Sequence, residues 1–424
     1  MYTKSYKSLR RALLMLCLAA CGTGASWATT SVHNVGNNEA ESLAVSAQTS
    51  DTNGEYAIQL TTGGTLQEKL LEAGADLATV TTLTVTGPIN GTDIDVLHGK
   101  LTALTTLDLS NANICAGGDS YHDWKITNNI LTKGSNAYNT ENNVVGDYMF
   151  CNIPQLQKLV LPSTVTKIGK YAVAKCPNLT DMQQFPQGVT WIDEFAFYNT
   201  AVSSITLGAA LQYIGRYAFS GSGLTSIIIP GGVTQLQERT FDECAQLTEA
   251  HLPETMTSIG QHAFRNCKNL ESANLPGRLE SLGSYAFASC SKLSSIEIPA
   301  SLQAIDIYAF SHCYSLKNVV FNEGLTNIGD NAFQDCQSLT KIELPSTVKR
   351  VGRYAFCNCQ SIASLNLPEG LTIADQYAFY GCRNLTEVTL PAGITHLADN
   401  LFGNCTSLTT VNLSPATQSI GSSS

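Results

Sequence analysis

Nine of the 14 cysteines share one position of a repeat, and thiols at such regular spacing could form disulfides or hold a metal ion. They are Cys176, Cys244, Cys267, Cys290, Cys313, Cys336, Cys359, Cys382 and Cys405. Stacked units about 5 Å apart would bring neighbouring thiols within disulfide range, but parallel units point their Cβ atoms the same way. A linear row also does not converge on a tetrahedral zinc ion. Because Thr200 and Ser222 take equivalent places, we expect small, buried and free thiols here.

The other residue types that catalyse reactions or bind metals are scattered along the chain. The seven histidines form no H-E-x-x-H motif, and neither a nucleophile elbow nor a glycine-rich phosphate loop is present in the sequence. Cys151 and Cys357 follow the repeat phenylalanine directly, where other units have polar residues, so we expect them to be partly exposed. The sequence therefore predicts that the protein is not an enzyme and uses no metal or cofactor.

The cysteines follow a repeat that is clearest at phenylalanine. From Phe241 a phenylalanine returns every 23 residues up to Phe402, and the series continues backwards through Phe219, Phe197, Val173 and Phe150 with steps of 22 to 24. A fixed period in this range indicates a solenoid, in which one small unit is stacked on itself many times.

Each unit shows two kinds of spacing. Pairs such as Ile296 and Ile298 alternate with polar residues, which predicts a half-buried strand, and a proline follows in most units. Ile259, Phe264 and Cys267 then fall on one side of a two-turn helix, and the Gly or Asp that opens this segment would be its N-cap. The prediction is an α/β repeat solenoid of about 14 units, with a parallel sheet on the concave face and short helical turns on the convex face.

The best unit, Leu339 through Cys359, follows the pattern L-x-x-I-x-L-P-x-x-[VL]-x-x-I-G-x-x-A-F-x-x-C. This pattern resembles the BspA-like class of leucine-rich repeats found in bacterial surface proteins, and the resemblance covers residues 80–421. It implies a leucine-rich-repeat solenoid that is exported and non-enzymatic. The class is associated with adhesion to host matrix proteins or to other bacteria, and it defines no ligand-binding residues that could be carried onto this chain.

The residues ahead of the repeats predict an export signal, a tether and a cap. Residues 1–28 have four basic residues before the apolar stretch Ala12–Ala20, as a signal peptide does. Cleavage after Ala28 would release the protein, whereas a lipoprotein-like box over residues 18–21 would end the signal at residue 20 and acylate Cys21. Residues 29–53 are polar and predict a flexible tether. Residues 54–79 predict a strand and a helix with a capping box at Thr65, and thus an N-terminal capping segment.

An insertion interrupts the repeat at residues 115–145. It contains several asparagines together with Tyr121, Trp124 and Tyr138. Insertions in solenoids lie on a rim and often bind ligands, so these aromatic residues are candidate binding residues. The alternative is a partly ordered loop that packs its aromatic rings on the first repeats. At the other end, Leu413 and Ile420 repeat the unit's spacing, so we expect an unfinished last unit.

The net charge of the chain limits the classes of molecule that it is expected to bind. Removing the signal takes away four basic residues and leaves 20 basic and 34 acidic side chains, a formal charge of −14. This argues against binding nucleic acid or anionic lipid, and no second apolar run is long enough to span a bilayer. Membrane attachment would rest on Cys21 alone. The expected location is the cell surface or the outer membrane, with a secreted or periplasmic protein as the alternatives.

The outward positions of the predicted sheet are the general candidate for a binding face. The candidate residues there are Glu249, His251, Glu297, Lys341, Glu343, Asn366 and Glu387. The rows are mostly small and polar, and they lack the aromatic stripe on which sugars stack. We therefore expect an adhesin that recognises host matrix or bacterial surface proteins. The alternative is a surface glycan-capture protein that serves nutrient uptake.

Overall fold

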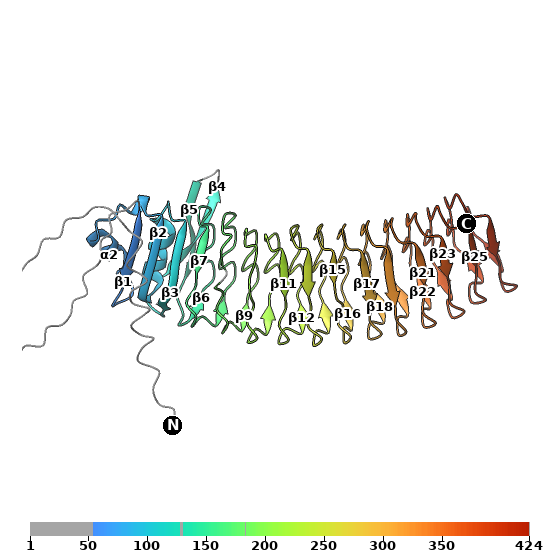
Figure 1. Ribbon diagram of the computed structural model, residues 1–424, viewed down its shortest axis with the longest axis horizontal. Coiled ribbons are helices and arrows are strands. Elements are labelled where there is room, and N and C mark those ends of the chain that lie inside the picture. Colours follow the sequence, from blue (N-terminus) through green and yellow to red (C-terminus); the bar gives the residue numbers. More distant parts are fainter. Residues whose placement is uncertain (1–53, 128–129, 183, 424) are drawn as a thin grey trace, which may run out of the picture. The chain divides into compact units, whose positions relative to one another are not determined.

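A computed structural model describes residues 54–127, 130–182 and 184–423. They belong to the second of the two units into which the chain divides, Met1–Ser46 and Ala47–Ser424. The described chain coils through about 16 turns of roughly 23 residues, each laid beside the last (Figure 1). The predicted parallel-sheet solenoid is confirmed. The count exceeds 14 partly because β1 (Glu55–Gln59), in the predicted cap, pairs in parallel with β2 (Thr82–Ile89) and so begins the sheet itself.

Two stacks of parallel strands run along the solenoid. The first stack consists of β1, β2, β3 (Thr106–Ile114), β7 (Lys158–Val160), β11 (Ser226–Ile228), β13 (Glu249–His251), β15 (Ser272–Ala273), β17 (Ser295–Ile298), β19 (Asn318–Phe321), β21 (Lys341–Glu343), β23 (Ser364–Asn366), β25 (Glu387–Thr389) and β27 (Thr410–Asn412). Its pairing is interrupted, so the hydrogen-bonded groups are β1-β2-β3-β7, β11-β13-β15, β17-β19, β21-β23 and β25-β27. In-register pairs such as Ile227 with Ala250 place equivalent residues of successive turns side by side.

The second stack is made of two-residue strands on another side of the core. Its members are β6 (Val144–Val145), β8 (Lys167–Ile168), β9 (Trp191–Ile192), β10 (Tyr213–Ile214), β12 (Gln235–Leu236), β14 (Ser258–Ile259), β16 (Ser281–Leu282), β18 (Ala304–Ile305), β20 (Asn327–Ile328), β22 (Arg350–Val351), β24 (Ile373–Ala374), β26 (His396–Leu397) and β28 (Ser419–Ile420). These strands differ from the prediction. The sequence pattern placed Ile259 at the start of a helix, whereas Ile259 pairs with Leu282 in parallel.

The predicted helical turns are wrong for the repeats, where the segment around each phenylalanine is a run of tight turns. Tyr285 and Ser289 have φ of 59° and 62°, and a left-handed residue every four positions cannot be part of an α-helix. The amide N–H groups instead alternate. Phe287 donates to Ala309 of the next turn at 2.8 Å, and Ala288 donates to Tyr285 of its own turn at 3.1 Å. Backbone hydrogen bonds thus join successive turns on this side as well.

The core between these sides is a column of stacked phenylalanines. The rings from Phe197 to Phe402 follow one another with centroids 5.0–5.6 Å apart, and most are fully buried. Leucine, isoleucine and alanine side chains of every turn complete the core. Since each turn buries its apolar side only against its neighbours, the stack is stable only as a series.

Helices occur near the N-terminal end, where α2 (Leu66–Glu72), a 3-10 turn (Leu77–Thr79) and α3 (Gly91–Gly99) lie. The predicted capping box of α2 is wrong, because the Thr65 side chain donates to the Thr62 carbonyl instead. Its place is taken by the buried carboxylate of Asp93 in α3, which accepts from the amides of Gly64 at 2.6 Å and Leu66 at 2.9 Å. Neither helix among the described residues has the length and apolarity needed to cross a membrane.

The insertion folds as an antiparallel hairpin of β4 (Tyr121–Thr127) and β5 (Ile130–Tyr138), which extends from the side of the first turns (Figure 1). The Lys133 ammonium of β5 lies 2.9 Å from the Asp95 carboxylate of α3. The hairpin is therefore tied to the helix beside it. The predicted signal peptide, the tether and Cys21 lie outside the described residues.

Candidate binding surface

The first stack presents its outward side chains as a continuous face. In the three-residue strands from β11 to β25 the middle residue packs towards the core, as Ala250 and Ile342 do, so the residues on either side point to solvent. The seven predicted residues of the sheet all lie exposed on this face, on β13, β17, β21, β23 and β25. We call these outward positions from β11 to β25 the sheet face.

Ionisable side chains on the sheet face form pairs within single strands. Glu249 and His251 of β13 approach to 2.9 Å, and Lys341 and Glu343 of β21 to 3.1 Å. Such exposed pairs add little stability, about 0–1 kcal/mol each. The remaining glutamates accept amide hydrogen bonds: Asn322 donates to Glu297 at 2.9 Å, and Asn412 donates to Glu387 at 2.8 Å. The surface therefore has partly fixed acceptor groups, with neutral strands between the charged ones.

Two apolar side chains on the sheet face were not chosen as candidates from the sequence. Ile228 on β11 is 68% exposed and Val320 on β19 is 51% exposed. The sequence signal was an apolar residue at a position where most turns have a polar one. Exposed apolar residues within a polar face are typical contact points for another protein.

A shallow hollow lies between β23 and β25. Its volume is about 410 Å³, and its lining includes the predicted residues Asn366 and Glu387 together with Ser364, Glu369 and Thr389. The hollow thus brings two of the predicted residues together on neighbouring strands. The other five are spread over β13, β17 and β21 and share the face without sharing a cavity.

The aromatic residues of the insertion, which were candidate binding residues, differ in their contacts with the rest of the protein. Tyr121 is 1% exposed, and its hydroxyl donates to the Asp147 carbonyl at 2.9 Å, so it is not available to a ligand. Burial raises the pKa of this phenol well above its usual range. Tyr138 is partly buried and packs between Tyr121 and Tyr148, with centroids 5.8 and 5.2 Å apart. The backbone of Trp124 pairs with Lys133 in the hairpin.

A second aromatic column lies on the turn side. Tyr148, Tyr171, Phe195 and Tyr217 stack with centroids 4.5–4.9 Å apart, and shorter runs follow at Tyr285–Tyr308 and Tyr354–Tyr377. Because each ring face covers the next, these rings offer edges and hydroxyl groups rather than open faces for sugar stacking. Among the described residues, the outward positions of the first stack hold no aromatic side chain.

The repeat cysteines are free thiols in the described part of the chain. Cys290 donates from Sγ to the Phe264 carbonyl of the preceding turn at 3.2 Å, and the other repeat cysteines make the equivalent contact. Burial raises the pKa of Cys176 to about 12. Cys151 and Cys357 are buried too, so their predicted exposure is wrong. No group of metal ligands was found among the described residues.

A parallel solenoid with an exposed sheet face and buried, free thiols is a leucine-rich-repeat scaffold, a class that generally binds proteins. The family described as a BspA type leucine rich repeat region, in 6 copies, matches residues 143–250, 234–344 and 326–424. The chain belongs to this family. Its members are typically bacterial surface proteins and non-enzymatic binding scaffolds.

The comparison with solved structures found several leucine-rich repeat proteins, of which the first supports the fold. A leucine-rich repeat protein from Bacteroides ovatus is 23% identical with a TM-score of 0.55, over 72% of this chain and 90% of its own. A leucine rich cell surface protein from Faecalibacterium prausnitzii is 24% identical with a TM-score of 0.38, over 71% and 95%. The pneumococcal vaccine antigen PcpA is 20% identical with a TM-score of 0.43, over 69% and 87%. None of the curated proteins matches the chain significantly.

Proposed function

We propose that this protein is an exported, non-enzymatic adhesin that recognises a host matrix or bacterial surface protein through the sheet face. The observation that carries the proposal is the sheet face itself: a long polar surface on stacked strands, with exposed Ile228 and Val320 among hydrogen-bonding side chains. Protein interfaces combine apolar contact points with a polar surround in this way. Membership of a family of bacterial surface proteins supports the same function.

Glycan capture for nutrient uptake is the second candidate. The polar hollow at Asn366 and Glu387 favours it, because such side chains could hydrogen-bond sugar hydroxyls. The absence of aromatic side chains on the described outward positions ranks it below a protein ligand, since open aromatic faces supply much of the contact area for sugars.

A binding screen that offers matrix proteins, bacterial surface proteins and polysaccharides side by side tests the proposal. We expect saturable protein binding that falls at least tenfold in the double variant Ile228→Lys, Val320→Lys. The matched control is Ile373→Lys, at a 46% exposed residue of the second stack, which should bind like the unaltered chain. Saturable binding to glycans alone would reverse the ranking, and equal loss in both variants would remove the sheet face from the proposal.

Export rests on residues 1–28, and anchoring rests on Cys21. An acylated Cys21 would hold the protein on a membrane through residues 29–53 as a tether, whereas cleavage after Ala28 would release it. Mass spectrometry of the mature N-terminus separates the two. A lipid-modified peptide that begins at Cys21 supports anchoring at the outer membrane, and an unmodified peptide that begins at Thr29 supports a released protein.

A further inference from the structure

Val320 is an exposed apolar side chain between two glutamates of the sheet face. It is 51% exposed on β19, and Glu297 of β17 pairs with it in register on the preceding turn. Glu343 holds the equivalent position in β21 on the following turn. Because neighbouring strands lie about 4.8 Å apart, the two glutamates flank Val320 with their backbones about 10 Å from each other. A partner that contacts Val320 therefore meets carboxylates on both sides of it.

Both of these carboxylates have an oxygen available to a partner. Asn322 donates to Oε1 of Glu297 at 2.9 Å, and Lys341 donates to Oε1 of Glu343 at 3.1 Å. Among the described residues Oε2 of either glutamate accepts no hydrogen bond, and both side chains are exposed. Exposed ion pairs such as that of Lys341 are weak, so a competing cation can replace it.

The charge of the whole sheet face favours a basic partner. Its outward positions from β11 to β25 hold four carboxylates and one ammonium group, a formal charge of −3 with histidine neutral. These residues are Glu249, Glu297, Glu343, Glu387 and Lys341. The outward strand residues of the second stack show no such excess, since in the described strands they include Lys167 and Arg350 and no carboxylate. Cationic groups are therefore attracted to the sheet face.

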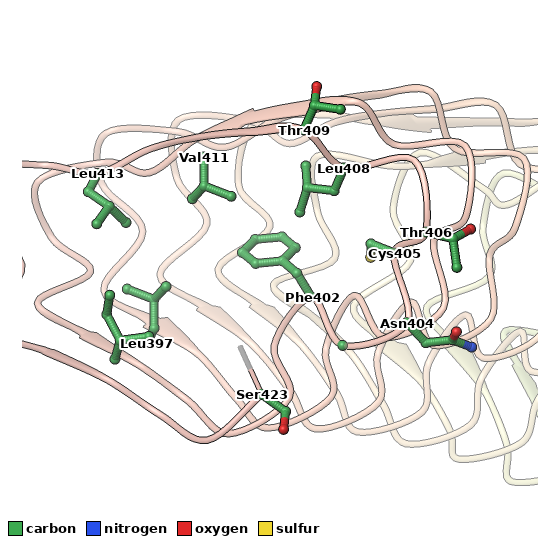
Figure 2. A pocket seen from close by; sticks show the side chains of 12 residues that line it. Leu397, Phe402, Asn404, Cys405, Thr406, Leu408, Thr409, Val411, Leu413 and Ser423 are labelled. Atoms are coloured by element: carbon green, nitrogen blue, oxygen red, sulfur yellow. The ribbon is translucent and has the colours of Figure 1, made fainter.

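The hollow at the last described turn has no comparable charge. It has a volume of about 520 Å³, and its lining includes the apolar side chains of Phe402, Leu408 and Val411 (Figure 2). None of its lining residues is charged, so it offers no counter-ion to a basic group. The sheet face is the better match for such a partner.

We propose that the sheet face binds a basic segment of a partner protein, with one arginine of that segment seated on Val320. The aliphatic stem of an arginine packs on an apolar side chain while its charged end stays in water. Its planar guanidinium has five N–H donors and can reach the carboxylates of Glu297 and Glu343 together, which suits it better than the compact ammonium group of lysine. This arginine site rests on the proposed binding of a protein through the sheet face, and it adds the chemistry of the partner.

Fluorescence anisotropy of labelled hexa-arginine, hexa-lysine and hexa-glutamate peptides with the full-length chain tests the site. We expect hexa-arginine to bind at least threefold more tightly than hexa-lysine, and hexa-glutamate not to bind. Glu297→Gln and Glu343→Gln should each weaken hexa-arginine binding at least fivefold, and Val320→Ser at least threefold. The matched control is Glu280→Gln, which removes an exposed carboxylate directly before β16 of the second stack and changes the net charge equally.

Circular dichroism confirms that each variant is folded. Equal affinities for hexa-arginine and hexa-lysine would overturn the arginine site, as would a loss in Glu280→Gln equal to that in the two sheet-face glutamate variants. The binding screen separates the site from the adhesion. A protein ligand that is lost in the Ile228→Lys, Val320→Lys double variant but unchanged in both glutamate variants overturns the site alone. Hexa-arginine binding that depends on both glutamates supports the site even where the screen finds no protein ligand.

Discussion

The residue at the cysteine position acts as a small hydrogen-bond donor inside the core. The Phe264 carbonyl accepts from the Cys267 amide at 3.3 Å and from the Cys290 thiol at 3.2 Å, so both of its lone pairs are used. Thr200, which replaces cysteine in one turn, donates from its hydroxyl to the Phe197 carbonyl of its own turn at 3.0 Å. The sequence indicated a small residue at this position, and the structure adds that the cysteines and Thr200 also donate hydrogen bonds there.

Burial of the thiols predicts how many of them react. A thiol reagent at mild alkaline pH should modify few cysteines of the native protein, chiefly Cys115, which is partly exposed. After denaturation the count should rise by eleven, the number of buried cysteines in the described part of the chain. A count that stays low after denaturation without a reductant would show disulfides instead.

Raised thiol pKa values also predict loss of stability at alkaline pH. Burial raises the pKa of Cys151, Cys176 and Cys357 to about 12, above the ordinary value of 9.0 that applies to the unfolded chain. The stability that the buried thiols contribute is therefore fully present below pH 9. Between pH 9 and pH 12 each thiol lowers the free energy of unfolding by up to about 1.4 kcal/mol per pH unit.

The urea midpoint at pH 8, 9.5 and 10.5 checks this prediction. The unaltered chain should lose stability more steeply than Cys176→Ser, whose hydroxyl does not ionise in this range. Tyrosine ionisation affects both proteins alike, so it does not change the difference between them. Parallel pH curves for the two proteins would contradict the prediction.

At the level of elements, the sequence predicted the first-stack strands and failed on the turns. Strand positions such as Ile296 and Ile298 could be predicted because alternation of apolar and polar residues fits a half-buried strand better than a helix. The spacing of Ile259, Phe264 and Cys267 fits a helix, but it also fits a short strand followed by two tight turns. The structure adopts the second arrangement because left-handed residues, such as His262 and Asn266, let the amides reach the neighbouring turn.

The hairpin shows what sequence could and could not reveal about the candidate site. The break in period located the insertion, but side-chain burial decides which of its aromatic rings can meet a ligand. Tyr121 is buried because its hydroxyl reaches the Asp147 carbonyl of a turn that lies 26 residues further along the chain. Such a contact depends on the path of the insertion and is not encoded in local spacing.

Replacement of Tyr121 tests how the hairpin is fastened. Tyr121→Phe leaves the partly buried Asp147 carbonyl without this donor and should cost about 0.5–1.5 kcal/mol of unfolding free energy, measured by denaturant titration. Tyr138→Phe is the matched control, since its ring is only partly buried, and it should cost less. A larger loss in the control would show that the hairpin is held at Tyr138 rather than at Tyr121.

At the scale of the whole molecule, the period of 23 residues predicted the solenoid and its one parallel sheet, but not the second stack of strands. A unit that cannot bury its own apolar side must repeat against copies of itself, so the period alone indicates the stacking. It did not predict that the first turn of the stack lies in residues 54–79. The sequence of β1 does not match the repeat, and its pairing with β2 is visible only in the structure.

A one-dimensional stack also predicts that the effect of a core substitution depends on its place along the series. Phe287 stacks between Phe264 and Phe310, whereas among the described residues Phe402 stacks on Phe379 alone. Phe287→Ala should cost about 3–5 kcal/mol and expose several turns on both sides to hydrogen exchange. Phe402→Ala should cost less and raise exchange only in the last described turns. Equal costs, or an exchange pattern from Phe402→Ala that reaches β17, would mean that the stack unfolds as a single cooperative block.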